Sequence, residues 1–276
     1  METIRVREIS SKELREYMAD AKEDRYQLVD VREPKEYKQA HIPGALLLPL
    51  KEVETGIIDL DLEKDLIFYC RSGRRSRIAA NLVADMGVPA RNIFNLEGGI
   101  LSWQGKRLPE FPKLALFPPA MDISQMLLRA FELEKGTRNF YLACSKAFDH
   151  EALAREASTL AGMEVDHARI VYHCLKKNTP GIQDFETLFD KVEAEIMEGG
   201  LSVSGAIKRL EDMEGELYLN FCELALDIEF MAYDLYKNLV ARAEDSEIVK
   251  TMSILAEQEK GHIRIIAMMI RKAPSF

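Results

Sequence analysis

The sequence lacks a long apolar run, paired cysteines and an excess of basic residues. No stretch approaches the ~18 apolar residues that a membrane helix needs, and the opening METIRVREIS has no apolar signal-peptide core. No Cys-x-x-Cys pair suggests a disulfide framework or a zinc or iron ribbon, because the four cysteines lie far apart at Cys70, Cys144, Cys174 and Cys222. A net charge of −9 argues against binding a phosphate backbone. We therefore expect a cytoplasmic protein that binds neither membranes nor nucleic acids.

Proline is scarce in the second half of the chain, which suggests a division into two domains. Eight of the ten prolines precede residue 121, and four of them lie in residues 108–120. The length of 276 residues, with 47% hydrophobic and 30% charged residues, fits a globular protein with more than one domain. We predict a first domain over residues 1–108, a semi-rigid linker over 109–120 and a second domain over 121–276.

The two predicted domains have different hydrophobic patterns. Short apolar, β-branched runs at residues 27–31 and 65–69 alternate with helical patterns such as residues 76–86, which predicts a parallel α/β sheet with flanking helices. After the linker, long stretches follow a helical period and are interrupted at residues 178–181 and 199–200. The second domain is therefore predicted to be all-α.

A repeat with an offset of 95 residues organises the helical half. In each copy, a glutamate is followed by a tyrosine seven residues later and by a Glu-x-x-His motif that begins 30 residues later. The residues concerned are Glu134, Tyr141, Glu164 and His167 in the first copy, and Glu229, Tyr236, Glu259 and His262 in the second. The repeat predicts two related helix pairs, joined by a long crossover between the second and third helices.

The repeated glutamates lie on apolar helix faces. The residues three, four and seven positions from Glu164, Glu229 and Glu259 are almost all apolar, whereas Glu134 has Arg138 one turn further on. A single glutamate in such a place is more often an edge residue or a protonated acid. An uncompensated buried carboxylate costs several kcal/mol. The four costs together would be comparable to the whole free energy of unfolding of a domain. Two divalent ions would balance four carboxylates, and a carboxylate-rich set with one imidazole per ion favours iron or manganese.

Two glutamates on separate helices plus two Glu-x-x-His motifs resemble the ligand pattern of the ferritin-like di-iron proteins, most closely the rubrerythrin family, over residues 121–276. The resemblance implies a four-helix bundle that holds two iron ions and reduces hydrogen peroxide or dioxygen. It also implies that some glutamates bridge the ions, with one ion held mainly by Glu134, Glu164 and His167 and the other by Glu229, Glu259 and His262.

The sequence departs from the rubrerythrin pattern in two respects. It has no four-cysteine rubredoxin module, so we expect an external electron donor. The additional carboxylate that rubrerythrins carry one turn before the third-helix glutamate is replaced by Leu226, which leaves a symmetric set of six ligands. Tyr141 and Tyr236 either hydrogen-bond to a ligand or are ordinary core aromatics.

One cysteine of the first half lies in a distinctive loop. An apolar strand pattern is followed by Cys70, Arg71, Ser72, Gly73, Arg74, Arg75 and Ser76, after which a helical pattern begins. Backbone N–H groups and a helix N-terminus lower the pKa of a thiol and bind anions. The alternative is a buried strand-end thiol beside a solvated basic turn. Because the loop combines glycine with three arginines, we favour an anion-binding site.

The flanking motifs of the first half resemble those of a single-domain rhodanese over residues 5–107. They are residues 30–33, 36–37, 41–45, the loop at Cys70, and residues 97–100 with Trp103. The resemblance implies that Cys70 takes sulfur from a donor as a persulfide, which the amides of residues 71–75 stabilise, and passes it to a thiol or to cyanide. It makes Asp30, Arg32, Glu36 and His41 mainly architectural. A phosphatase loop of the Cys-x5-Arg type would need arginine at Ser76, and the shorter Cys-x4-Arg loop fits a sulfur atom better than a phosphate.

We therefore expect a sulfurtransferase coupled to a di-iron oxidoreductase that reduces peroxide or dioxygen. Its partners would be a small-molecule sulfur donor such as thiosulfate, a thiol acceptor and an external electron donor, and the family resemblance favours a homodimer. One alternative is a sulfur or redox sensor that acts on a partner protein without turnover. Another is a metal-free bundle that only dimerises.

Overall fold

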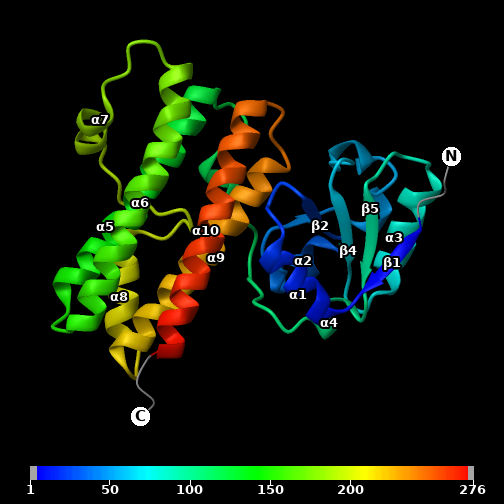
Figure 1. The fold of residues 1–276 in the computed structure, drawn as a ribbon, viewed down its shortest axis with the longest axis horizontal. Helices are drawn as coiled ribbons and strands as arrows, with labels where there is room; N and C mark the ends of the chain where they lie inside the picture. Colours follow the sequence, from blue (N-terminus) through cyan, green and yellow to red (C-terminus); the bar gives the residue numbers. More distant parts are fainter. Residues whose placement is uncertain (1–4, 273–276) are drawn as a thin grey trace. The chain divides into compact units, whose positions relative to one another are not determined.

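The computed structural model describes residues 5–272, which form two compact units (Figure 1). The first unit ends at Pro112 and also includes residues 236–243. The second comprises residues 113–235 and continues from Glu244. None of the helices described is both long and apolar enough to cross a membrane.

The first unit contains a five-stranded sheet in which every neighbouring pair of strands is parallel. The strands are β1 (Val6–Ile9), β2 (Tyr26–Asp30), β3 (Ala45–Leu47), β4 (Asp65–Tyr69) and β5 (Asn92–Leu96). Their order is β1-β5-β4-β2-β3, so β4 is central, with Phe68 opposite Val29 of β2 and Asn95 of β5. In open parallel sheets, ligands bind outside the carboxyl ends of the strands. Cys70 follows β4 directly at this edge.

Helices pack on both faces of the sheet. They are α1 (Ser11–Asp20), α2 (Pro34–Gln39), α3 (Arg74–Asp85) and α4 (Gly99–Ser102), with 3-10 turns at Leu50–Glu52 and Gly56–Asp59. Successive residues of β4 face opposite sides, as the two-residue period of a strand requires. Leu66 and Phe68 belong to a core cluster with residues of α3, whereas Ile67 and Tyr69 belong to one with residues of α1 and α2. The predicted parallel sheet with flanking helices is confirmed.

The second unit is rich in helix, as predicted. Its long helices are α5 (Ile123–Ala147), α6 (Glu151–Asn178), α9 (Leu217–Val240, whose last turn belongs to the first unit) and α10 (Ser246–Lys272). The crossover between α6 and α9 carries the short helices α7 (Phe185–Lys191) and α8 (Val203–Asp212). Buried side chains of all four long helices form one core cluster. The proline-rich segment before α5 holds one 3-10 turn, Leu114–Leu116, and α5 begins after Asp122, which caps it in a reciprocal pair with Gln125.

Candidate functional site

Cys70 lies in a loop that joins the central strand β4 to helix α3. The side chain is buried, and Gly73 caps α3 with a φ of 85°, a left-handed conformation that glycine adopts without strain. The amide of Gly73 donates a hydrogen bond to the Sγ atom over 3.2 Å, and the Ser76 hydroxyl lies 3.4 Å from the same sulfur. The loop therefore wraps the thiol with hydrogen-bond donors.

The donors of this loop favour the thiolate. Burial raises the pKa of the Cys70 thiol, but hydrogen bonds from the Ser76 hydroxyl and from the amides of Ser76, Ser72 and Gly73 outweigh burial, so the pKa lies below its ordinary value. The N-terminus of α3 adds a positive potential at the same position. The same donors can stabilise an anionic sulfur attached to Cys70, which matches the chemistry predicted for the loop.

The glycine turn at the start of α4 is hydrogen-bonded to the backbone of the Cys70 loop. The amides of Ile100 and Leu101 in α4 donate to the carbonyl oxygens of Cys70 and Arg71 over 2.8 and 3.1 Å. This approach requires glycine at position 99, because a Cβ atom there would lie 2.3 Å from the Cys70 carbonyl oxygen. The loop conformation is thus fixed by contacts with a second segment as well as by its own hydrogen bonds.

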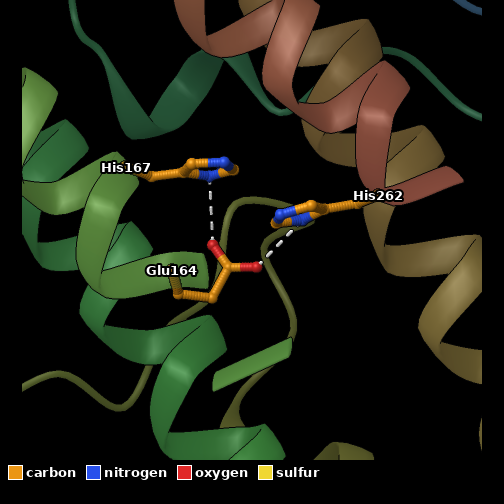
Figure 2. A group of neighbouring side chains, drawn as sticks. All are labelled: Glu164, His167 and His262. Atoms are coloured by element: carbon orange, nitrogen blue, oxygen red, sulfur yellow. Dashed lines mark ion pairs between the residues drawn. The ribbon is translucent and has the colours of Figure 1, made fainter. Parts of the chain in front are cut away.

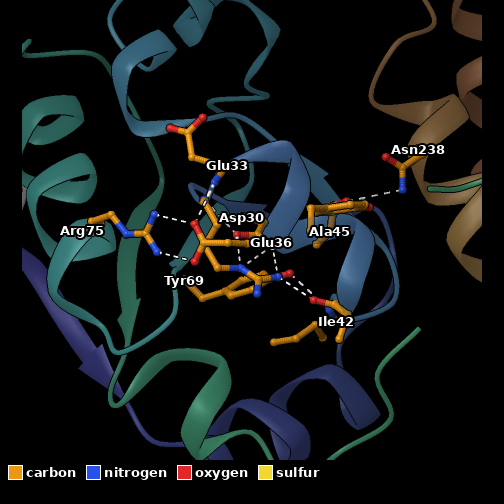
Figure 3. Close-up of polar contacts among 11 residues, drawn as sticks. Asp30, Glu33, Glu36, Ile42, Ala45, Tyr69, Arg75 and Asn238 are labelled. Carbon is orange, nitrogen blue, oxygen red and sulfur yellow. Dashed lines mark hydrogen bonds and ion pairs between the residues drawn. The ribbon is translucent and has the colours of Figure 1, made fainter. Parts of the chain in front are cut away.

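The three arginines of the loop differ in their surroundings. Arg75 makes a two-pronged ion pair with Glu36 of α2, with both N–O distances at 2.7 Å (Figure 3). The hydrogen bond from Arg75 lowers the pKa of Glu36. Arg71 and Arg74 are exposed. Arg75 therefore ties the start of α3 to α2, while Arg71 and Arg74 can attract an anion from solvent.

Other residues that the sequence marked as architectural hold the loops of this edge together. Asp30 and Arg32 form a buried ion pair at 2.6 Å, and Arg32 also donates to the carbonyl oxygen of Ala40 over 2.7 Å. The Tyr69 hydroxyl accepts from the amide of Ile42 over 3.1 Å (Figure 3). His41 exchanges two backbone hydrogen bonds with Leu108, both at 2.9 Å. These contacts connect successive loops without touching the Cys70 sulfur.

The six residues predicted as metal ligands meet inside the helical unit. Glu134 is on α5, Glu164 and His167 on α6, Glu229 on α9, and Glu259 and His262 on α10, and each is at most 2% exposed. Donor atoms from these residues form three overlapping groups whose members lie within 4.8 Å of one another. Most of the apolar neighbours that placed these glutamates on inward helix faces are buried with them, and Leu226 and Ile263 are partly buried.

The two histidines share two of the glutamates. The carboxylate of Glu164 reaches both rings, with Oε2 3.2 Å from Nδ1 of His167 and Oε1 3.2 Å from Nδ1 of His262 (Figure 2). Glu259 likewise approaches both rings, at 3.1 and 3.6 Å. Glu134 reaches only His167, and Glu229 only His262, each at 3.2 Å. Glu164 and Glu259 are thus placed to bridge two positions that the other residues flank.

The electrostatics of the cluster favour positive charge at its centre. Burial lowers the pKa of His262, but the carboxylates of Glu229 and Glu164 outweigh burial and raise the pKa to about 11. Burial raises the pKa of Glu164, yet the two histidines lower it to about 2. The carboxylates therefore create a strongly negative potential at the rings. Two imidazolium ions or bound metal cations can each balance this negative potential.

Of the two repeat tyrosines, Tyr141 binds a candidate ligand directly. Its hydroxyl on α5 donates a hydrogen bond to Oε1 of Glu229, a residue of the other repeat. Tyr236 is also fully buried, seven residues after Glu229 on α9. A hydrogen bond of this kind orients a ligating carboxylate. The geometry at Tyr141 supports the ligand-orienting alternative for that residue.

A fifth buried glutamate of the helical unit, Glu198, was missed by the sequence reasoning. It lies in the crossover before α8, is 1% exposed, and accepts a hydrogen bond from the Thr137 hydroxyl of α5. Burial raises the pKa of Glu198 well above its ordinary value, and the negative charges of Glu134, Glu164 and Glu259 raise it further. Glu198 has no counterpart in the 95-residue repeat, so the spacing of the sequence held no signal for it.

The donor set fits a pair of hard or borderline metal ions. Oε1 of Glu198 and Nε2 of His262 are buried without a hydrogen-bond partner. Both oxygens of Glu164 and Oε1 of Glu259 make ion-pair contacts with imidazole nitrogens at 3.1–3.2 Å but no hydrogen bond of good geometry. Leaving such groups unsatisfied costs about 1–3 kcal/mol each, and more when they are charged. Carboxylate oxygens together with imidazole nitrogens are ligands that iron and manganese accept. Bound cations would satisfy the oxygens that the protein leaves without donors.

Several known proteins are similar to the first unit of the chain. Residues 10–106 match the rhodanese-like domain family. A sulfurtransferase of Allochromatium vinosum is 36% identical over 104 residues, which span 38% of this chain and 94% of that protein. A candidate sulfurtransferase of Bacillus subtilis, YtwF, is 33% identical over 105 residues, 38% of this chain and 97% of that protein. The solved structure of a rhodanese-like domain protein from Staphylococcus aureus covers 38% of this chain and 98% of its own, with 24% identity and a TM-score of 0.34. The Cys70 loop lies inside the matched residues 10–106, and the six candidate metal ligands lie outside them.

Proposed function

The chain belongs to the rhodanese-like family, and on this basis we propose that it transfers sulfane sulfur through Cys70. From the buried cluster of the helical unit we further propose that this activity is coupled to a di-iron oxidoreductase. The observation that carries the first activity is the buried Cys70 thiol, which receives hydrogen bonds from the Gly73 amide and the Ser76 hydroxyl. The observation that carries the second is the buried cluster of four glutamates and two histidines. We assign the helical unit to the ferritin-like four-helix bundles of the rubrerythrin type.

In the sulfur-transfer reaction, Cys70 is the nucleophile. Its thiolate attacks the outer sulfur of a sulfane-sulfur donor such as thiosulfate, forming an S–S bond while the donor's own S–S bond breaks. Sulfite leaves with the electron pair of the broken bond, and Cys70 becomes a persulfide. An acceptor thiolate then attacks the outer sulfur, which forms the acceptor persulfide and returns the Cys70 thiolate.

The residues around Cys70 support both steps. The amides of Ser72, Gly73 and Ser76 keep negative charge on sulfur stable, so the thiolate is present before attack and the persulfide afterwards. Exposed Arg71 and Arg74 attract an anionic donor to the loop. The ion pair between Arg75 and Glu36 keeps the start of α3, and with it the donor amides, in position.

In the helical unit, the residues present would hold two iron ions. Glu164 and Glu259 would each contribute to holding both ions, since each approaches both His167 and His262. A ferrous pair, when bound, would supply the two electrons that, with two protons, convert hydrogen peroxide to two waters, and an external donor would restore them. The Tyr141 hydroxyl fixes the orientation of Glu229.

The sulfur-transfer proposal is tested with thiosulfate as donor and cyanide as acceptor. Cys70→Ser is expected to abolish thiocyanate formation, because serine is a far weaker nucleophile at neutral pH. Cys174→Ser, which replaces another buried thiol, is the matched control and is expected to retain the wild-type rate. Wild-type turnover in Cys70→Ser would refute the assignment of the nucleophile.

The di-iron proposal is tested by metal analysis of anaerobically iron-loaded protein, followed by peroxide consumption with a chemical reductant. We expect two iron ions per chain in the wild type and a large loss of both iron and peroxide consumption in Glu164→Gln, which loses a bridging carboxylate. Glu151→Gln, at an exposed position of the same helix, is the control. If the wild type binds no iron, or if Glu164→Gln keeps two ions and full activity, the proposal is wrong.

A further inference from the structure

Glu198 reaches the interior of the helical unit from the crossover rather than from one of the four long helices. We propose that Glu198 is a further ligand of one of the two metal positions, the one formed by Glu134, Glu164, His167 and Glu259. This inference rests on the proposed di-iron centre. Its consequence is that the two positions have unequal numbers of carboxylates, although the repeat makes the other six ligands symmetric.

The path of the crossover explains how Glu198 reaches the cluster. Residue 136 of α5 is glycine, and a Cβ atom there would lie 2.1 Å from the carbonyl oxygen of Ile196. The crossover therefore passes directly over the backbone of α5, at the position two residues after Glu134. An isolated bridge between Ile196 and Ser202, with hydrogen bonds of 2.9 and 2.8 Å inside the turn, fixes the segment that carries Glu198.

The surroundings of Glu198 indicate a cation rather than a purely structural acid. One oxygen, Oε2, accepts from the Thr137 hydroxyl, which orients the carboxyl group. The other, Oε1, is buried and has no hydrogen-bond partner. Thr137 follows Glu134 by three residues on α5, so this contact brings the carboxyl group of Glu198 to the helix turn that carries Glu134, whose side chain is also buried. Two adjacent buried carboxyl groups, one with a free oxygen, form a place where a metal ion would satisfy both.

The location of Glu198 relative to the histidines selects one position. Its carboxyl group is hydrogen-bonded to Thr137, which lies one turn after Glu134 on α5, and Glu134 belongs to a group that contains His167 but not His262. The groups that contain His262 include Glu164, Glu229 and Glu259 but not Glu134, and Tyr141 donates to Glu229. We therefore expect the ion near His167 to have one more carboxylate ligand than the repeat alone would give it.

The test measures Mn²⁺ binding to the full chain, with Mn²⁺ as the only added metal and a chelator as competitor. We expect the wild type to bind two ions, and Glu198→Gln to weaken one position by about 100-fold or more while leaving the other unchanged, because loss of a residue that only hydrogen-bonds to a ligand already costs about 10–100-fold. Glu195→Gln is the matched control, because Glu195 is an exposed residue of the same crossover, and its acceptor role toward Ser204 survives the change. Both variants are first compared with the wild type by circular dichroism without metal.

Anomalous diffraction from crystals of the Mn²⁺-loaded wild type provides a readout that does not depend on a variant. An Mn²⁺ peak at a coordination distance of about 2.0–2.2 Å from the free oxygen of Glu198 would support the proposal. Two ions bound with wild-type affinities in Glu198→Gln, or an Mn²⁺ peak beyond 3 Å from Glu198, would overturn the proposal and leave the di-iron centre intact. A wild-type chain that binds no Mn²⁺ and no iron would refute both.

Discussion

The hydroxyl of Ser76 is expected to lower the pKa of Cys70, and Ser76→Ala isolates its contribution. The substitution removes the hydroxyl that lies 3.4 Å from Sγ but keeps the amides of Ser72, Gly73 and Ser76. A hydrogen bond to a charged group contributes about 1.5–3 kcal/mol, and the length of this one points to the lower end. Since a shift of one pKa unit corresponds to about 1.4 kcal/mol, the Cys70 pKa should rise by about one unit. At a pH well below the midpoint, the thiolate fraction then falls about tenfold, whereas above both midpoints it is unchanged.

The assay is the pH dependence of Cys70 alkylation by iodoacetamide, a neutral reagent whose rate follows the thiolate fraction. Peptide mapping separates Cys70 from the other thiols, and burial raises the pKa of Cys144 to about 12 and that of Cys222 to about 11, which keeps both thiols protonated. Ser72→Ala is the matched control, because it removes an exposed hydroxyl of the same loop and keeps the donor amide. An alkylation midpoint in Ser76→Ala that equals or lies below that of the wild type would refute the reasoning.

Three further substitutions test the scaffold by urea denaturation. Glu36→Gln removes an ion pair whose side chains are about one-third exposed, so we expect the free energy of unfolding to fall by about 0.5–1 kcal/mol at low ionic strength. The loss should be smaller in 1 M salt, which screens the ion pair, and an equal loss at both salt concentrations would contradict an ionic origin. Gly136→Ala should cost about 1–3 kcal/mol because its Cβ would collide with the Ile196 carbonyl oxygen, and a neutral result would show that the crossover can move away. Gly162→Ala, on α6 with no atom within 4 Å of its Cβ, should instead stabilise by up to about 1 kcal/mol through helix propensity, and a destabilised variant would contradict that free space.

The parts of the fold that can be predicted from the sequence are those in which apolar residues recur at the regular spacing of a strand or a helix. The apolar run of β4 alternates between two cores, with Phe68 facing one and Tyr69 the other, so its sequence alone predicts a strand buried on both faces. The residues of the helical cluster could be selected because their neighbours at helical spacing are apolar and because the pattern occurs twice. The ion pair between Glu36 and Arg75 spans 39 residues of sequence, and only the completed sheet brings its partners together.

Glu198 shows why the rest of the candidate site escaped sequence reasoning. The residue lies in an irregular turn, where neither a helical nor a strand period marks which side chains point inward. Its position depends on Gly136, a residue 62 positions earlier whose missing side chain lets the crossover approach α5. Such a close backbone contact is a property of the tertiary structure. A single glycine within a long helical pattern is otherwise expected only to weaken the helix.

The contact of Gly99 with the Cys70 loop also restricts how this enzyme scaffold can be re-engineered. A loop lengthened by one residue, to enclose an oxyanion as large as phosphate, would push the Cys70 carbonyl against a turn that already leaves no room for a methyl group. Conversion of the sulfur site into a phosphatase would therefore require residues 98–101 to be redesigned together with the inserted residue. The size of the anion that the loop can enclose is set by two segments of the chain, and a library that varies only residues 71–75 should yield no phosphatase.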